Sequence, residues 1–141
     1  MSISQGEQKV IEILKKEGKN FEREYIFSDF KSTRGGRPRF DFAVFDDDGN
    51  IDYLLEYDGI LHFKDGNIWT STRREFLYRQ DMDVKKNSYC LARGIKLFRI
   101  PYYDYEKLNS CRDLIKPHYE VTTKWHNHII RQELLSQLDN K

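Results

Sequence analysis

The 141-residue sequence predicts an α/β fold, with a central mixed β-sheet of about four strands flanked by helices. Segments with helical or strand-like apolar spacing follow one another in the order helix, three strands, helix, strand, helix. Nine Phe, nine Tyr and two Trp supply enough apolar surface for a packed core despite the high charge content. No repeat or low-complexity linker divides the chain. We therefore expect one domain over residues 1–141, with a core at about 4–103 and a helical extension at about 104–141.

The first elements are a helix and a strand followed by a basic loop. Ser4 and Glu7 form a Ser-x-x-Glu capping box and predict a helix over residues 4–17. Alternating apolar residues predict a strand over 21–27. Residues 28–38 form a loop whose basic, glycine-containing tip could clamp a phosphate group. An ordinary solvated loop fits the same composition equally well.

An acidic segment follows this loop. Residues 40–63 contain seven carboxylates and no Lys or Arg, which gives a local charge of −7. The remaining residues contain 24 basic and 16 acidic side chains, a net charge of +8. An acidic pocket within a basic surface suits an enzyme that holds a cation and binds a polyanion.

The acidic segment predicts a β-hairpin that turns at residues 47–50. If Asp46 pairs with Ile51, the strand register places Asp41 directly opposite Glu56. Their Cβ atoms would then lie roughly 5 Å apart on one face, where two like charges are destabilising without compensation. A divalent cation would compensate them. We interpret the acids at the hairpin tip as solvated turn residues.

Further elements follow the hairpin. A capping box and helical spacing predict a long helix over residues 73–93, and an apolar run predicts an inner strand over 95–100. Another helix is expected over 105–115 and a final amphipathic helix over 125–138. The histidines near the start of this last helix lack the ββα pattern of an HNH site, and we interpret them as surface residues.

The residues that could carry chemistry are, in chain order, Glu7, Asp41, Glu56, Asp58, His62, Asp83 and Lys86. Carboxylates on strands together with a nearby His form the oxygen-rich donor set that Mg²⁺ uses. His62 could act as a general base or stabilise developing charge. Glu7 is also explained by its capping role. Asp83 and Lys86 could instead form surface ion pairs with Arg79 on the long helix.

Five motifs in order add up to a family resemblance. They are Ser4-x-Gly6-Glu7, Arg39-Phe40-Asp41-Phe42, Glu56-Tyr57-Asp58-Gly59-x-x-His62, Asp83-x-x-Lys86-x-x-Tyr89-Cys90 and Ile95-Lys96-Leu97-x-Arg99-Ile100-Pro101-Tyr102. Together they resemble the PD-(D/E)XK nuclease superfamily. Within it they are most similar to the branch of the very-short-patch-repair endonucleases and the phage-type homing endonucleases with a Glu-Asp-x-His-Asp site. The resemblance covers about residues 4–103 and implies a restriction-endonuclease-like fold.

The resemblance implies a Mg²⁺-dependent DNA endonuclease, homing-type or nicking, that hydrolyses a phosphodiester by metal-activated water, with Mn²⁺ able to substitute. Asp41 would be the central metal ligand, with Glu56 or the Tyr57 backbone carbonyl completing the site and Asp58 as a further candidate. His62 would activate or position the water. Catalytic roles are implied for Glu7, Asp41, Glu56, His62, Asp83 and Lys86, with Lys86 holding the scissile phosphate.

Two departures from the family pattern keep other functions open. Asp58 stands where the superfamily has Lys, so His62 or Lys86 must supply that function, or the metal count differs. The structural zinc cluster of the mismatch-repair enzymes is also missing from the sequence. The alternatives are a structure-selective nuclease acting on junctions or mismatches, and a catalytically silent nucleic-acid-binding module.

Partners and location are predicted more coarsely. The expected DNA contacts are Arg34, Arg37, Arg39, Trp69, Arg73, Arg74 and Arg79. Trp69 could wedge between bases or cover the core. No separate recognition domain is visible, so a long target would require loops, a homodimer or a targeting partner. Without a membrane-length apolar run, a secretory signal or a disulfide framework, we expect a cytoplasmic protein, and the resemblance suggests a phage or mobile element as its source.

Overall fold

The computed structural model describes residues 3–32, 34–58 and 73–124, and only the backbone over 73–76. Its elements are α1 (Gln5–Lys16), β1 (Asn20–Ile26), β2 (Arg39–Phe45), β3 (Ile51–Asp58), α2 (Arg73–Arg93), β4 (Leu97–Pro101), η2 (Tyr102–Lys107), α3 (Cys111–Leu114) and η3 (Pro117–Tyr119). The strands form one sheet in the order β1-β2-β3-β4. Because β3 and β4 are parallel while the other neighbours are antiparallel, the sheet is mixed. The predicted α/β class is confirmed.

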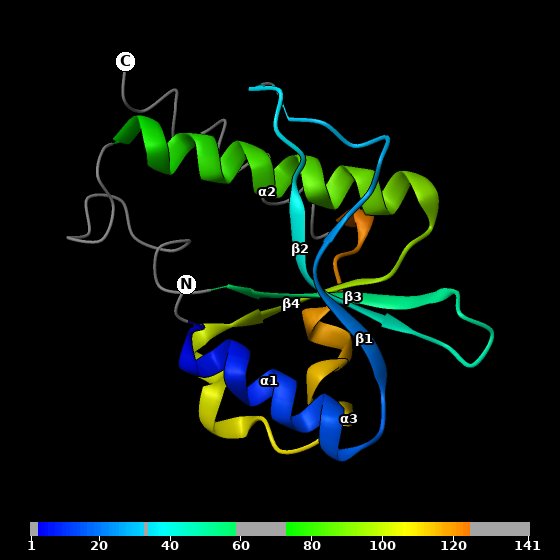
Figure 1. Ribbon diagram of the computed structural model, residues 1–141. Coiled ribbons are helices and arrows are strands. Elements are labelled where there is room, and N and C mark those ends of the chain that lie inside the picture. The colour runs from blue at the N-terminus through cyan, green and yellow to red at the C-terminus, as the bar shows by residue number, and fades with distance from the viewer. Residues whose placement is uncertain (1–2, 33, 59–72, 125–141) are drawn as a thin grey trace.

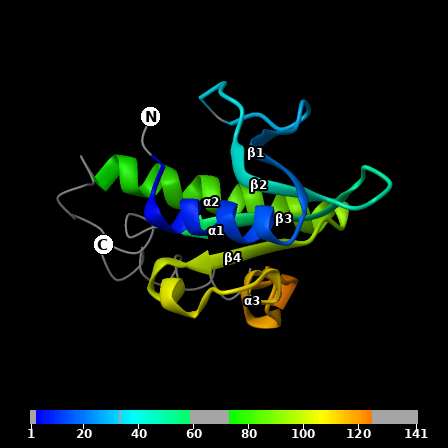
Figure 2. The ribbon, with the colours of Figure 1, turned by 60° about the horizontal axis from the view of Figure 1, so that its bottom comes forward.

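The sheet separates two layers of helix (Figure 1). α1 and α3 cover one face and α2 crosses the other, an arrangement that Figure 2 shows from a second direction. Side chains along β3 alternate between the two faces of the sheet. Leu55 packs in the core between the sheet and α1, whereas Leu54 packs in the core between the sheet and α2. Leu108 and Leu114, which follow the predicted core boundary at residue 103, belong to the same core as α1. The core therefore extends beyond residue 103.

The hairpin register is the predicted one in its interior. Its central pairs are Phe42 with Leu55, Ala43 with Leu54 and Val44 with Tyr53. Near the turn the prediction is wrong, because Ile51 pairs with Phe45 and not with Asp46, and a bulge separates this pair from the others. The Asp46 carboxylate accepts the backbone N–H groups of Asp48 and Asn50, at 2.9 and 3.0 Å. Asp46 is therefore part of the turn, and the bulge places Asp52 of β3 between the two successive pairs.

The strand predicted as an inner one lies at the edge of the sheet, so that prediction is wrong. Among the strands of residues 3–32, 34–58 and 73–124, β4 pairs with β3 alone. Its other edge meets a later segment, where the Val121 N–H donates to the Leu97 carbonyl at 2.8 Å and Phe98 bridges Glu120. The apolar composition of β4 thus reflects cover by non-strand chain, one of the ways in which proteins protect a sheet edge.

The single helix predicted over 105–115 is also wrong. η2 ends at Lys107, and α3 begins only after Ser110. Ser110 and Asp113 form a capping box that starts a new helix, and the intervening Leu108 is fully buried. Local capping and one buried side chain therefore divide the segment into two short turns.

The first two helices agree closely with prediction. Ser4 caps α1, with its Oγ accepting the Glu7 N–H at 3.1 Å, and α2 covers the predicted 73–93. The helix expected over 125–138, His62 and Trp69 lie outside the described residues. None of the helices among residues 3–32 and 73–124 is long and apolar enough to cross a membrane.

Candidate active site

Asp41 lies where the regular pairing of β2 stops. The ladder between β2 and β3 ends at the Phe42–Leu55 pair. The ladder between β2 and β1 is interrupted opposite Asp41, at Glu24, whose φ is 52°. Instead of joining the ladder by its backbone, Asp41 accepts the Tyr57 N–H through its carboxylate at 2.7 Å. The side chain is thus drawn towards the end of β3, as the predicted opposition to Glu56 requires.

The carboxyl groups of Asp41 and Glu56 share a hydrogen bond. Burial raises the pKa of Asp41 to about 9, and the negative charge of Glu56 together with this hydrogen bond adds to the shift. The Tyr57 N–H opposes the shift, while the more distant charge of Glu7 favours it. Without added positive charge, Asp41 therefore keeps its proton at neutral pH.

Glu7 approaches this pair from α1. Burial raises its pKa, the positive charge of Arg23 opposes the shift, and the charge of Glu56 adds to it. The Arg23 guanidinium lies 3.9 Å from the Glu7 carboxylate. The position of the helix depends on Gly6, because a Cβ atom there would lie 2.0 Å from Cζ of Tyr57. Gly6 thus allows the end of α1 to rest directly on the tyrosine that follows Glu56.

Lys86 reaches the same cluster from α2. Its Nζ lies 2.7 Å from Oε1 of Glu56, and both side chains are largely buried. The surface ion pairs expected among Arg79, Asp83 and Lys86 are therefore not the arrangement found. Asp83 contacts Arg99 instead, and the buried Nη1 of Arg79 has no hydrogen-bond partner in the part of the chain that the structure describes.

Arg99 is the central residue that the site prediction lacked. It is buried on β4, where its Nη1 lies 3.0 Å from Oδ1 of Asp58 and 3.5 Å from Oδ1 of Asp83. Its Nε donates to Oδ1 of Asn87 at 2.8 Å, and Nη2 donates to the Asp83 carbonyl at 3.2 Å. The Arg99 guanidinium therefore connects β3 with α2, and its two partners on α2, Asp83 and Asn87, flank Lys86 in the sequence. The available signal was a lone Arg in the apolar strand Ile95-Lys-Leu-Phe-Arg-Ile100.

Asp58 belongs to this ion-pair network. Its carboxylate faces Arg99 on the same side of β3 as Glu56. Position 58, where the sequence resemblance led us to expect Lys, thus holds an acid with its own buried cation. The cation next to Glu56 comes from Lys86 on α2 instead.

The arginines predicted to bind DNA have varied surroundings. Arg34 stacks on the Tyr78 ring with its Cζ 3.7 Å from the centroid, and Arg39 pairs with Glu24 at 3.3 Å. Arg37 is exposed on the loop before β2. For Arg73 and Arg74 the structure places only the backbone of α2, and Trp69 lies outside the described residues.

The described residues, 3–32, 34–58 and 73–124, hold no group of three or more His, Cys, Asp or Glu side chains positioned to bind a metal ion. The pair Asp41 and Glu56 still fits a Mg²⁺ site, because this ion commonly uses one or two carboxylates and keeps several waters. Burial and the neighbouring charge of Glu56 raise the pKa of Asp41, so a cation bound between the two carboxyl groups would favour its ionised form. His62, the predicted water-positioning residue, lies outside the described part. Comparisons with models of known families, with curated proteins and with solved structures found no match.

Proposed function

We propose that this chain is a Mg²⁺-dependent DNA endonuclease with a restriction-endonuclease-like fold. The observation that carries the proposal is the pair of partly buried Asp41 and buried Glu56, with the pKa of Asp41 raised to about 9 and the Lys86 ammonium 2.7 Å from Glu56. Strongly shifted carboxyl groups beside a buried lysine are typical of sites that bind metal or move protons. The motif resemblance supports the same chemistry.

The charges around the pair favour a divalent ion. Four acids, Asp41, Glu56, Asp58 and Asp83, meet two bases, Lys86 and Arg99, so the fully ionised cluster carries a net charge of −2. In the metal-free protein the proton on Asp41 removes half of this excess. A divalent cation held by Asp41 and Glu56 would remove all of it and would release that proton.

Each residue around this ion would have its own role. Bound Mg²⁺ would polarise a phosphodiester oxygen and lower the pKa of an attacking water. Asp41 and Glu56 would hold the ion, and Lys86, already at the carboxylate, would donate a hydrogen bond to a phosphate oxygen. Glu7 would face the cluster from α1. His62 remains the candidate for orienting the water.

Cleavage of supercoiled plasmid tests this proposal. Wild-type protein is incubated with Mg²⁺, with Mn²⁺ and with EDTA, alongside Asp41→Asn and Asp47→Asn. Both changes replace one carboxylate by an amide, but Asp47 lies exposed in the hairpin turn. We expect metal-dependent cleavage that Asp47→Asn leaves intact and Asp41→Asn lowers by roughly 100-fold or more, since metal contacts supply several kcal/mol of transition-state stabilisation. Cleavage in EDTA, or normal cleavage by Asp41→Asn, would overturn the assignment.

A catalytically silent nucleic-acid-binding module is the second candidate. Asp58 in place of the superfamily's Lys favours it, because Arg99 already neutralises this acid and leaves it a structural role. The same experiment separates the two functions. DNA binding that is retained while cleavage is missing with both metal ions would favour the silent module.

A further inference from the structure

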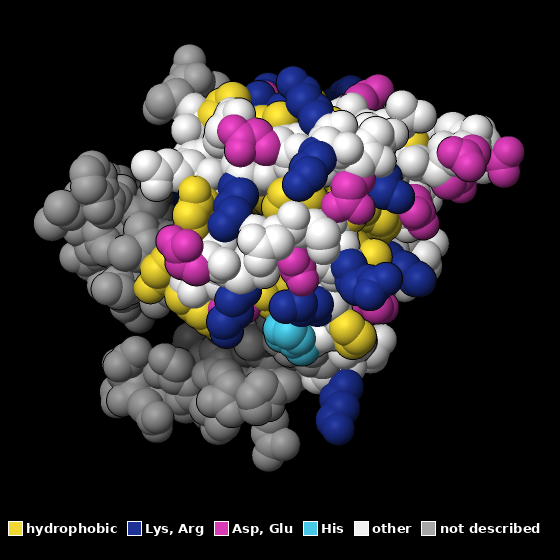
Figure 3. All heavy atoms as spheres, turned by 90° about the horizontal axis from the view of Figure 1, so that it is seen from below, with side chains coloured by type: hydrophobic (Ala, Val, Ile, Leu, Met, Phe, Trp, Pro, Cys, Tyr) yellow, Lys and Arg dark blue, Asp and Glu magenta, His cyan; other side chains and the backbone are white. Residues whose placement is uncertain are grey.

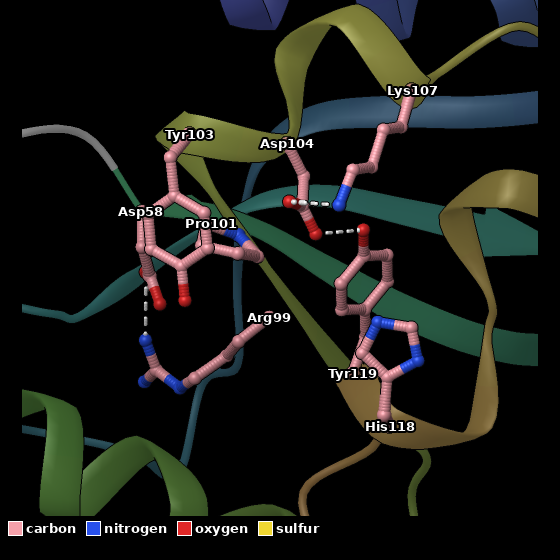
Figure 4. Close-up of a pocket in the computed structure, with 8 residues that line it drawn as sticks. All are labelled: Asp58, Arg99, Pro101, Tyr103, Asp104, Lys107, His118 and Tyr119. Carbon is pink, nitrogen blue, oxygen red and sulfur yellow. Dashed lines mark hydrogen bonds and ion pairs between the residues drawn. The ribbon is translucent and has the colours of Figure 1, made fainter.

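A polar pocket lies at the outer edge of β4, between η2 and η3. Its volume is about 330 Å³, and it is lined by Asp58, Arg99, Pro101, Tyr103, Asp104, Lys107, His118 and Tyr119 (Figure 4). Asp58 and Arg99 belong both to this pocket and to the ion-pair network beside Glu56. The pocket therefore continues from the candidate active site, on the side of β4 away from β3.

The acids within the pocket are already neutralised by their neighbours. Asp104 is buried, accepts the Tyr119 hydroxyl and lies 3.4 Å from Nζ of Lys107. Asp58 faces Arg99. Because both carboxylates have partners of their own, they oppose the entry of an anionic group less than isolated acids would.

The rim combines an aromatic ring with cationic and imidazole groups. Tyr103 is 66% exposed, the highest value among the exposed large hydrophobic side chains that the structure describes. Lys107 leaves 68% of its side chain exposed, and the exposed His118 ring packs on Tyr119. On the face that Figure 3 shows, Lys and Arg side chains lie next to the imidazole. The rim thus offers a surface for stacking and donors for a phosphate.

We propose that this pocket binds a single unpaired nucleotide of the DNA strand close to the cleavage site. Its base would stack on Tyr103, and its phosphate would contact Lys107 and His118. Aromatic side chains bind bases by stacking, whatever the base, when the face of that base is accessible. A paired duplex shows only base edges in its grooves, so the nucleotide must be unpaired or extruded from the stack. This inference rests on the proposed nuclease function and narrows its substrate to DNA with an unpaired nucleotide.

Equilibrium binding measured by fluorescence anisotropy in EDTA tests the pocket without cleavage. Two labelled duplexes are compared, identical except for one additional unpaired thymidine in the second. We expect wild-type protein to bind the second duplex roughly tenfold more tightly, a preference within the range for one stacked base. Tyr103→Ala should abolish this preference, and Tyr103→Phe, which keeps the ring, should retain it.

The cationic side of the pocket has its own matched pair of variants. Lys107→Ala should weaken binding of the duplex with the unpaired thymidine more than binding of the paired duplex. Lys96→Ala removes an exposed lysine near the opposite end of β4 and should affect both duplexes equally. Equal affinity of wild-type protein for the two duplexes, or a preference that survives Tyr103→Ala, would overturn the inference.

The binding and cleavage experiments test the two proposals independently. Metal-dependent plasmid cleavage without a preference for the unpaired thymidine would overturn the pocket and leave the proposed nuclease standing. A preference that depends on Tyr103, without cleavage in any metal, would support the pocket and overturn the nuclease.

Discussion

Replacement of Arg99 by Met should be among the most destabilising single changes in the described part of the chain. The side chain is buried, and its loss leaves Asp58 and Asp83 without their shared cation and Asn87 without its donor. Removal of one partner from a buried ion pair costs about 3–5 kcal/mol, because the remaining charge stays buried without compensation. We expect the free energy of unfolding to fall by this amount, a large share of the roughly 5–15 kcal/mol of an ordinary domain.

Arg99→Lys separates charge from geometry. It keeps a positive charge opposite Asp58 but cannot also reach Asn87 and the Asp83 carbonyl, which the guanidinium binds through Nε and Nη2. Two lost hydrogen bonds at about 1–1.5 kcal/mol each predict a destabilisation of about 2–3 kcal/mol. The lysine variant should therefore fall between wild type and Arg99→Met.

Urea denaturation followed by circular dichroism at pH 7 measures these differences. Lys85→Ala is the control, because Lys85 forms a partly exposed ion pair with Asp81 at 2.9 Å on α2, the helix that also carries Asp83 and Asn87. Such pairs contribute about 0.3–0.5 kcal/mol. In a double-mutant cycle, Asp58→Asn should cost less in the Arg99→Met background than in wild type. If Arg99→Met lowers the free energy of unfolding no more than Lys85→Ala does, the buried ion-pair network does not stabilise the contact between α2 and β3.

Two further predictions concern Gly6 and Asp41. Gly6→Ala should destabilise the protein by about 1–3 kcal/mol in urea denaturation, because its Cβ would meet the Tyr57 ring, and Tyr57→Leu in the same chain should relieve part of the loss. Gly36→Ala is the control, since its Cβ would lie 3.7 Å from the nearest described atom, and an equal loss there would refute the steric explanation. Asp41 has a folded pKa of about 9, above the ordinary value of 3.8, so the folded state binds its proton more tightly and loses stability as pH rises between these values. Asp41→Asn should remove this loss and stabilise the metal-free protein at pH 7, and an unchanged pH profile would contradict the shifted pKa.

The hairpin shows how far the register of paired strands can be predicted from sequence. Side chains alternate with period two, so one correct pair fixes which residues face each other along the whole ladder. That reasoning placed Asp41 opposite Glu56 without knowledge of the fold, and the interior pairs agree with it. The tip escaped prediction because the Asp46 carboxylate accepts two backbone N–H groups, and this local contact makes Asp46 a turn residue and not a strand residue.

The role of Arg99 and the edge position of β4 escaped prediction for a different reason, although the strand itself was predicted. A sequence indicates that Ile95–Ile100 is apolar enough to be buried, but it does not show whether another strand or a later turn supplies the cover. The partners of Arg99 are likewise 12, 16 and 41 residues away, the first two on α2 and the third on β3. Only the packing of the long helix across the sheet brings Asp58, Asp83 and Asn87 to one guanidinium.

The positions of the charged residues on β3 and α2 connect these observations with the proposed chemistry. Glu56 and Asp58 are two residues apart and face α2 together, so a Lys at position 58 would compete with Arg99 for the same space. With Asp58 there instead, Arg99 is retained in the core, and the helix it fastens supplies Lys86 to Glu56. In the proposed nuclease site, Asp58 in place of the expected Lys therefore does not remove the cation. It moves the cation to another element, and the buried arginine holds that element in position.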